Sequence, residues 1–190
     1  YNGKIPRNPF AMYHVDPDHK EREFLTLDEL TAMTEIKLED PNMAFARDLF
    51  IFGCWTGISF IDIKNLTEDN ISMINGAPWI VSKRQKTGVP FQIKLMDIPM
   101  QIIGRYKAFR KGSHLFNIGN LDSINKRIKK VAAMCGIKKR VSFHVSRHSW
   151  AVLALEYGMP IESVSKILGH TNITTTQIYA KVTSTKLDHD

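Results

Sequence analysis

Cysteine is scarce in this sequence. The 190 residues include two cysteines, Cys54 and Cys135, and neither shows the short spacing to a second cysteine or to a histidine pair that zinc sites share. The sequence therefore argues against a disulfide framework and a cysteine-based metal centre, and it favours a reducing cytosol as the compartment. We expect neither a metal nor a cofactor.

Long apolar runs are missing as well. No run approaches the roughly 18 residues that a membrane-spanning helix needs. The first ten residues, YNGKIPRNPF, are polar and basic and do not resemble a signal peptide. We therefore expect a cytoplasmic protein without a membrane partner.

Negative charge is in short supply. Lysine and arginine number 26 against 19 aspartates and glutamates, so the formal net charge is +7 and the pI is near 9.4. This excess favours polyanionic partners such as nucleic acid, because bound cations neutralise phosphates and release counterions. Many basic proteins bind no DNA, so the charge alone decides little. The length suits one compact domain with a sizeable core.

Local patterns divide the chain into a polar start, several helices and one β region. Residues 1–24 are rich in proline, asparagine, aspartate and lysine without helical periodicity, which indicates a linker or arm. Thr26 and Glu29 have the spacing of a capping box, which predicts a helix over about 27–37. Asp40, followed by proline, predicts a second helix start. Further helical patterns cover residues 60–66, 98–110, 121–135, 160–168 and 174–180.

Residues 71–95 change to short β-like runs. Asn75-Gly76 between two apolar runs is a strong hairpin signal, and the loop 83–90 supplies a second turn. We therefore predict a mainly α fold with a small three-stranded antiparallel β-sheet, an α+β class. The helices at 98–110 and 121–135 carry basic side chains that would suit a DNA cradle, although charge runs are usually solvated surfaces. These are Arg105, Lys107, Arg110 and Lys111 on the first helix, and Lys126, Arg127, Lys129 and Lys130 on the second.

The segment from Ser142 to Lys181 contains the residues that suggest chemistry. His144 and Arg147 lie three residues apart, which places them on one face of a helix, and His170 and Tyr179 follow. Arginine and histidine donors match phosphate oxygens, and a tyrosine oxygen can form a covalent intermediate. Each residue alone is more often an ordinary structural one. Together they suggest phosphoryl transfer onto tyrosine.

The order of these residues resembles the catalytic signature of the tyrosine recombinase, or phage integrase, family. The matching letters are His144-x-x-Arg147, then Leu168-Gly169-His170, then Tyr179 nine residues later. The resemblance implies the catalytic-domain fold of that family over residues 25–182, preceded by a linker from an N-terminal DNA-clamping domain and followed by a truncated or flexible tail at 183–190. It also implies a bacterial, nucleoid-associated enzyme.

One position departs from the family pattern. Ser59 follows Thr56-Gly57-Ile58, where the family usually has the first of two phosphate-gripping arginines, while Asp62 matches the acidic residue often found three positions later. The loss of this donor either impairs catalysis or is compensated by another arginine that contacts the same phosphate. The sequence resembles integrases of Bacteroidetes mobile elements, which often lack this arginine. Arg47 and Arg84 are the candidate substitutes, and for Arg47 an ordinary helix charge beside Asp48 is an equally good interpretation.

The resemblance also implies a role for each motif residue. Tyr179 is the nucleophile, Arg147 and His170 stabilise the phosphate, and His144 accepts the tyrosine proton or donates to the phosphate. Lys86, in the hairpin segment Arg84-Gln85-Lys86-Thr87-Gly88, is the general acid; without the resemblance it would be an ordinary turn lysine. His148, next to Arg147, is also frequent in the family, and we interpret it as a structural residue.

Three functions are compatible with these residues. The first is site-specific recombination at double-stranded DNA attachment sites by a homotetramer, through a 3′-phosphotyrosyl intermediate, in integration or excision of a mobile element. Inversion and chromosome-dimer resolution are less favoured biological roles, and an isolated fragment is expected to be monomeric. The second is a DNA-binding module that has lost catalysis, and the third is a type IB topoisomerase. Retention of Tyr179 argues against the second.

Overall fold

The computed structural model describes residues 23–187. Most of the predicted arm at 1–24 and the last three residues of the predicted tail therefore lie outside the described residues. The elements in chain order are α1 (Leu27–Glu35), α2 (Pro41–Thr56), α3 (Phe60–Lys64), η1 (Glu68–Asn70), β1 (Ile71–Ile74), β2 (Ala77–Lys83), β3 (Pro90–Lys94), α4 (Asp97–Arg105), η2 (Lys107–Phe109), α5 (Leu121–Met134), α6 (Phe143–Glu156), α7 (Ile161–Leu168) and α8 (Thr174–Leu187).

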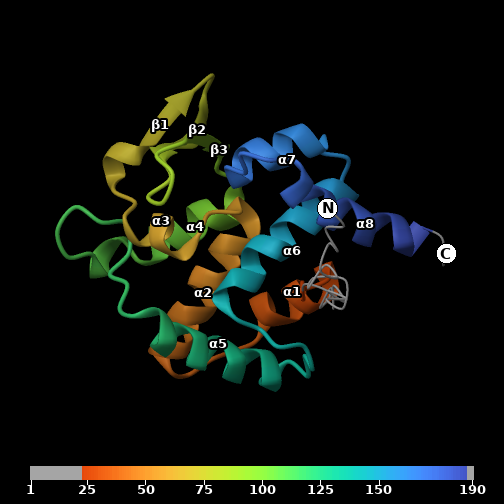
Figure 1. Cartoon of the computed structure of the whole chain (residues 1–190). Coiled ribbons are helices and arrows are strands. Elements are labelled where there is room, and N and C mark those ends of the chain that lie inside the picture. Colours follow the sequence, from red (N-terminus) through yellow and green to blue (C-terminus); the bar gives the residue numbers. More distant parts are fainter. Residues whose placement is uncertain (1–22, 188–190) are drawn as a thin grey trace, which may run out of the picture.

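Helix α2 forms the centre of the molecule and packs against α1, α4, α5 and α6 (Figure 1). Asp40 caps its N-terminus by accepting a hydrogen bond from the Asn42 amide, and Pro41 occupies the first turn, where no amide donor is needed. Most of its residues from Ala46 onward are buried in the main core. The predicted capping box at α1 is also confirmed, because the Thr26 and Glu29 side chains bond each other's backbone amides.

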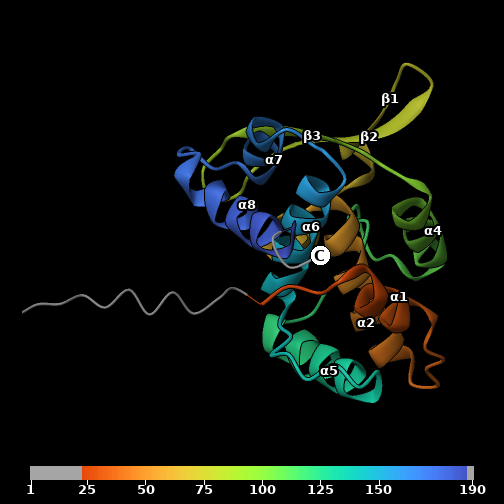
Figure 2. The same cartoon turned by 90° about the vertical axis from the view of Figure 1, so that its right-hand side faces the viewer.

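The predicted three-stranded antiparallel sheet is confirmed, with strand order β1-β2-β3. Asn75 and Gly76 both adopt positive φ in the β1–β2 turn, as the Asn-Gly signal predicts. Ile80 of β2 pairs with Ile71 of β1 and with Ile93 of β3. The sheet and α5 lie at opposite ends of the molecule in both views (Figures 1 and 2).

Helices α6, α7 and α8 enclose a second, smaller hydrophobic cluster, and α6 also packs on α2. Gly169 ends α7 in the left-handed conformation, as predicted. Two helix predictions need correction. Helix α4 ends at Arg105 and a separate 3-10 turn follows, and α8 continues to Leu187, past the predicted end at 180. Every helix in residues 23–187 is too short or too polar to cross a bilayer.

Candidate active site

Helix α6 carries two histidines and one arginine that belong to the candidate site. His144 is exposed, Arg147 is half-buried, and His148 is buried. His144 and His148 are four residues apart, and their rings meet edge to face with centroids 4.3 Å apart. The helix therefore sets an exposed imidazole, a guanidinium and a buried imidazole along one side.

Arg147 bridges two turns that lie far apart in the sequence. Its Nη1 donates to the carbonyl of Gly57 at 2.8 Å, and its Nη2 donates to the carbonyl of Leu168. Gly57 has a φ of 65°, and a Cβ there would approach the Trp150 ring to 2.6 Å, so only glycine fits this turn. Burial first, and then the neighbouring Arg84, lowers the pKa of Arg147 to about 10. The charged form of Arg147 is therefore less favourable in the folded protein than in the unfolded chain.

Arg84 stands beside Arg147 and is 6% exposed. Its Nη1 donates to Asp62 Oδ2 at 3.0 Å, its Nη2 donates to the Ile167 carbonyl, and its guanidinium lies 3.9 Å from the centre of the Phe91 ring. Burial lowers the pKa of Arg84, and Asp62 only partly opposes this shift. The two arginines thus donate to successive carbonyls at the C-terminus of α7, the negative end of its dipole.

Gly169 makes room for Arg84. A Cβ at Gly169, where φ is 66°, would lie 3.3 Å from Cγ and Nε of Arg84. The glycine of the Leu168-Gly169-His170 segment therefore serves both as a left-handed helix end and as space for a guanidinium stem.

Ser59 and Asp62 show how Arg84 comes to this place. Ser59 caps α3, and its hydroxyl donates to Asp62 Oδ2 at 2.7 Å, the same oxygen that Arg84 contacts. Asp62 Oδ1 accepts the Gln85 amide at 2.8 Å, which anchors the start of the β2–β3 loop. The small serine leaves the carboxylate accessible to an arginine that arrives from the end of β2.

Arg47 lies elsewhere. Its Nε donates to Asp48 at 2.6 Å, and its Nη1 donates to carbonyls at the end of α1, including those of Thr34 at 3.1 Å and Ile36 at 2.9 Å. These contacts make Arg47 a cap on α1. The structure therefore brings Arg84, and not Arg47, to Asp62 and Arg147.

The other predicted residues divide between the site and the surface. Nδ1 of the half-buried His170 lies 2.8 Å from the Thr176 hydroxyl, and His170 borders a pocket of about 350 Å³ between α7 and the β2–β3 loop. Lys86 is exposed at the tip of that loop, two residues after Arg84. In the predicted DNA cradle, Arg105 pairs with Asp48 and Arg110 with Glu68, which removes both from a free basic face.

Tyr179 is buried, with 3% of its surface exposed. Its Oη lies 2.6 Å from Nδ1 of His148, and it is close enough to Arg147 to affect that residue's pKa. The interpretation of His148 as a structural neighbour of Arg147 missed this contact. The available signal in the sequence was its position four residues after His144, because this spacing places His148 on the same helix face as a candidate catalytic histidine.

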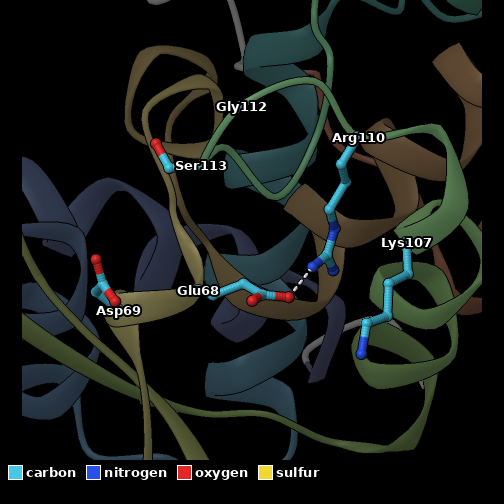
Figure 3. A pocket seen from close by; sticks show the side chains of 6 residues that line it. All are labelled: Glu68, Asp69, Lys107, Arg110, Gly112 and Ser113. Carbon is cyan, nitrogen blue, oxygen red and sulfur yellow. Dashed lines mark hydrogen bonds and ion pairs between the residues drawn. The ribbon is translucent and has the colours of Figure 1, made fainter.

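A second pocket, of about 270 Å³, lies away from these residues (Figure 3). Figure 3 shows Arg110 paired with Glu68 across it, with Lys107 at its edge. Because this arginine also donates to the Leu115 carbonyl at 3.1 Å, its donors serve the loop that follows α4. Residues 23–187 contain no group of three or more histidine, cysteine or acidic side chains placed to bind a metal ion.

The family model described as "Phage integrase family" matches residues 23–186. The tyrosine recombinase XerC of Natranaerobius thermophilus is 43% identical over 200 aligned positions, which cover 97% of this chain and 67% of that protein. The chain belongs to the phage integrase family. XerC of Neisseria meningitidis serogroup B is a further relative of this integrase chain, 28% identical over 85% of the chain and 54% of the relative.

Solved structures agree on the integrase fold. A XerH recombinase bound to its palindromic difH substrate in a post-cleavage complex has a TM-score of 0.75 at 19% identity, over 90% of this chain and 52% of that one. The Tn1549 transposon integrase bound to circular intermediate DNA has a TM-score of 0.68 at 19% identity, over 87% and 62% of the two chains. The predicted fold class is thereby confirmed. This chain spans between half and two thirds of the length of these proteins.

Proposed function

We propose that this integrase chain breaks and rejoins DNA through a covalent link between Tyr179 and a phosphate. One observation carries the proposal: the buried Arg84 and the half-buried Arg147 are adjacent, and Arg147 lies near the Tyr179 phenol. Their lowered pKa values mean that burial makes both charges costly. A phosphodiester would supply the negative charge that offsets this cost.

The arginines are suited to stabilise the transition state. Guanidinium donors match phosphate oxygens, and donors fixed in a partly buried site need no rearrangement as charge develops. The carbonyls of Gly57, Ile167 and Leu168 hold both groups in place, and Asp62 pairs with Arg84 alone, so one carboxylate faces two guanidinium groups. Arg84 therefore takes the place of the arginine missing at Ser59, while Arg47 stabilises the fold.

The remaining residues complete the reaction. The phenol oxygen attacks phosphorus, a 3′-phosphotyrosyl bond forms, and the bond to the 5′-oxygen breaks. Lys86, on an exposed loop that can approach a groove of DNA, gives its proton to that leaving oxygen. His144 and His170 donate to the phosphate, and Thr176 orients His170 through the 2.8 Å contact. Positioned cations replace the charge neutralisation that a metal supplies in other phosphoryl transfers.

The substrate we propose is double-stranded DNA carrying an attachment site, and the process is integration or excision of a mobile element by a tetramer on DNA. The relatives named as recombinases and the transposon integrase support this choice. The net charge of +7 supports a polyanionic partner. A similarity to integrases of Bacteroidetes mobile elements remains a prediction.

Covalent capture tests the proposal and recovers the attachment site in the same experiment. The protein is incubated with a library of nicked duplexes that carry a randomised core, denatured in detergent, and the DNA that stays attached is sequenced. We expect adducts with a shared sequence from wild type and none from Tyr179→Phe. Specific DNA binding without adducts would instead identify a binding module. Supercoil relaxation without recombinants would identify a topoisomerase.

A further inference from the structure

The contact between His148 and Tyr179 points to a role that the family motif does not assign. The His148 imidazole on α6 contacts the Tyr179 phenol on α8, with Nδ1 and Oη 2.6 Å apart. This is a heavy-atom distance at which a general base can accept a proton. The rings are tilted by 43° with centroids 5.5 Å apart, so the contact joins the nitrogen to the oxygen and is not a stack.

We propose that His148 accepts the phenol proton of Tyr179 when the nucleophile attacks DNA. This rests on the proposed function, in which Tyr179 is the nucleophile. In the attacking direction, the phenol donates to a neutral imidazole. The O–H bond breaks and an N–H bond forms at Nδ1, while Oη bonds to phosphorus and the 5′-oxygen leaves with a proton from Lys86. Each step reverses on rejoining.

Burial explains why the acceptor must be a protein group. His148 is 6% and Tyr179 3% exposed, so bulk water does not reach the phenol oxygen to take its proton. A free tyrosine has a pKa of about 10, so most phenol stays protonated near neutral pH without a base. His144, which the motif suggests for this task, contacts the ring of His148 and is the exposed member of the pair.

The same contact fixes the starting position of the nucleophile. Because Tyr179 is buried, DNA reaches its oxygen only after a local shift of α8. The phenol proton passes to Nδ1 as Oη approaches and bonds to phosphorus. His148 therefore acts on the reacting atom itself, which distinguishes it from a residue that merely packs beneath Arg147.

The test measures single-turnover adduct formation on the nicked duplex recovered by covalent capture. We expect His148→Ala and His148→Asn to lower the rate by about 100-fold, with binding to intact duplex unchanged. Asparagine is the decisive variant, because its amide can accept the phenol hydrogen bond but cannot carry the proton. His114→Ala, on an exposed loop, is the matched histidine control and should keep the wild-type rate.

Chemical rescue separates proton transfer from packing. Added imidazole should restore part of the His148→Ala rate in proportion to its concentration, whereas pyrazole, with a ring of the same size but little basicity, should not. A wild-type rate in His148→Asn, or equal rescue by pyrazole, would overturn the inference while leaving the tyrosine mechanism intact. No adduct from wild type would overturn the proposed function and this inference with it. If His148→Ala does not fold, the asparagine variant decides.

Discussion

Two clusters of arginines around a buried aspartate in this molecule are built from the same parts. The Asp48 cluster consists of Arg47, Asp48 and Arg105 with Tyr106, and the Asp62 cluster consists of Asp62, Arg84 and Arg147. Each has two arginines for one buried aspartate, and in each an arginine donates to carbonyls at a helix C-terminus. Residue types and local pairing therefore do not distinguish them.

Their electrostatics differ. In the Asp48 cluster, the Arg105 side chain is 54% exposed, and Asp48 raises its pKa. In the Asp62 cluster, burial lowers the pKa values of Arg84 and Arg147. The Arg105 side chain of the first cluster reaches solvent, whereas the second cluster buries two arginines' charge against one aspartate, which compensates it only in part. Buried groups with perturbed pKa values are typical of functional sites, and a ligand of opposite sign would offset the remaining charge here.

Exchanging Arg84 for glutamine should give the largest effect on chemistry. We expect Arg84→Gln to slow adduct formation by about 100-fold to 1,000-fold, because one fixed donor to the phosphate is lost. Arg84→Gln also breaks the buried ion pair with Asp62, so the free energy of unfolding should fall by about 3 kcal/mol, and the adduct rate is therefore compared per folded molecule. Quenched-flow adduct assays and calorimetry measure the two quantities.

A double variant tests whether an arginine at position 59 can replace Arg84. Adding Ser59→Arg to Arg84→Gln places a guanidinium within three residues of Asp62, at the usual family position, and should recover part of the lost rate. If the double variant stayed as slow as Arg84→Gln, the idea that these positions are interchangeable would be wrong.

The same substitution in the other cluster should act on the fold alone. We expect Arg47→Gln to lower the free energy of unfolding by about 3 kcal/mol, because it breaks a buried ion pair and the cap on α1. Adduct formation per folded molecule should match wild type. Urea denaturation measures the free energy of unfolding. A slow adduct rate from fully folded Arg47→Gln would show that the Asp48 cluster also contributes to chemistry, against the distinction drawn here.

A methyl group at Gly169 tests how closely Arg84 is held. Gly169→Ala should lower the free energy of unfolding by about 1 kcal/mol because of its left-handed φ, and it should also slow adduct formation by displacing Arg84. Gly112→Ala is the matched control, since its φ is 70° and no atom lies within 4 Å of the added Cβ. Equal adduct rates for the two variants would contradict the contact with Arg84.

The smallest effect is expected at the support of His170. Thr176→Val removes the hydroxyl that lies 2.8 Å from His170 Nδ1. The loss of one hydrogen bond of about 1 kcal/mol corresponds to a roughly fivefold slower adduct rate. Thr175→Val, at an exposed neighbouring position, is the control. Identical kinetics in both variants would show that the hydroxyl does not orient His170.

Much of the fold follows from short-range chemistry that can be read in the sequence. The box formed by Thr26 and Glu29, the Asn75-Gly76 turn and the left-handed Gly169 each depend on groups a few residues apart, and all three stand as predicted. The end of α8 was predicted less well. No glycine or proline stops that helix after Tyr179, and a polar composition alone does not set a helix end.

The candidate site also combines features that follow from the sequence with features set by tertiary packing. The sequence by itself determined which residue types are present and that His144 and Arg147 share a helix face, because the helix repeat fixes that neighbourhood. Only the tertiary structure decided which arginine joins Arg147, because the Arg84 contacts span 22 residues to Asp62 and 83 residues to Ile167. It also decided that His148 meets Tyr179, 31 residues away on another helix. Such contacts depend on how helices and strands pack, and residue spacing along the chain carries no record of that packing.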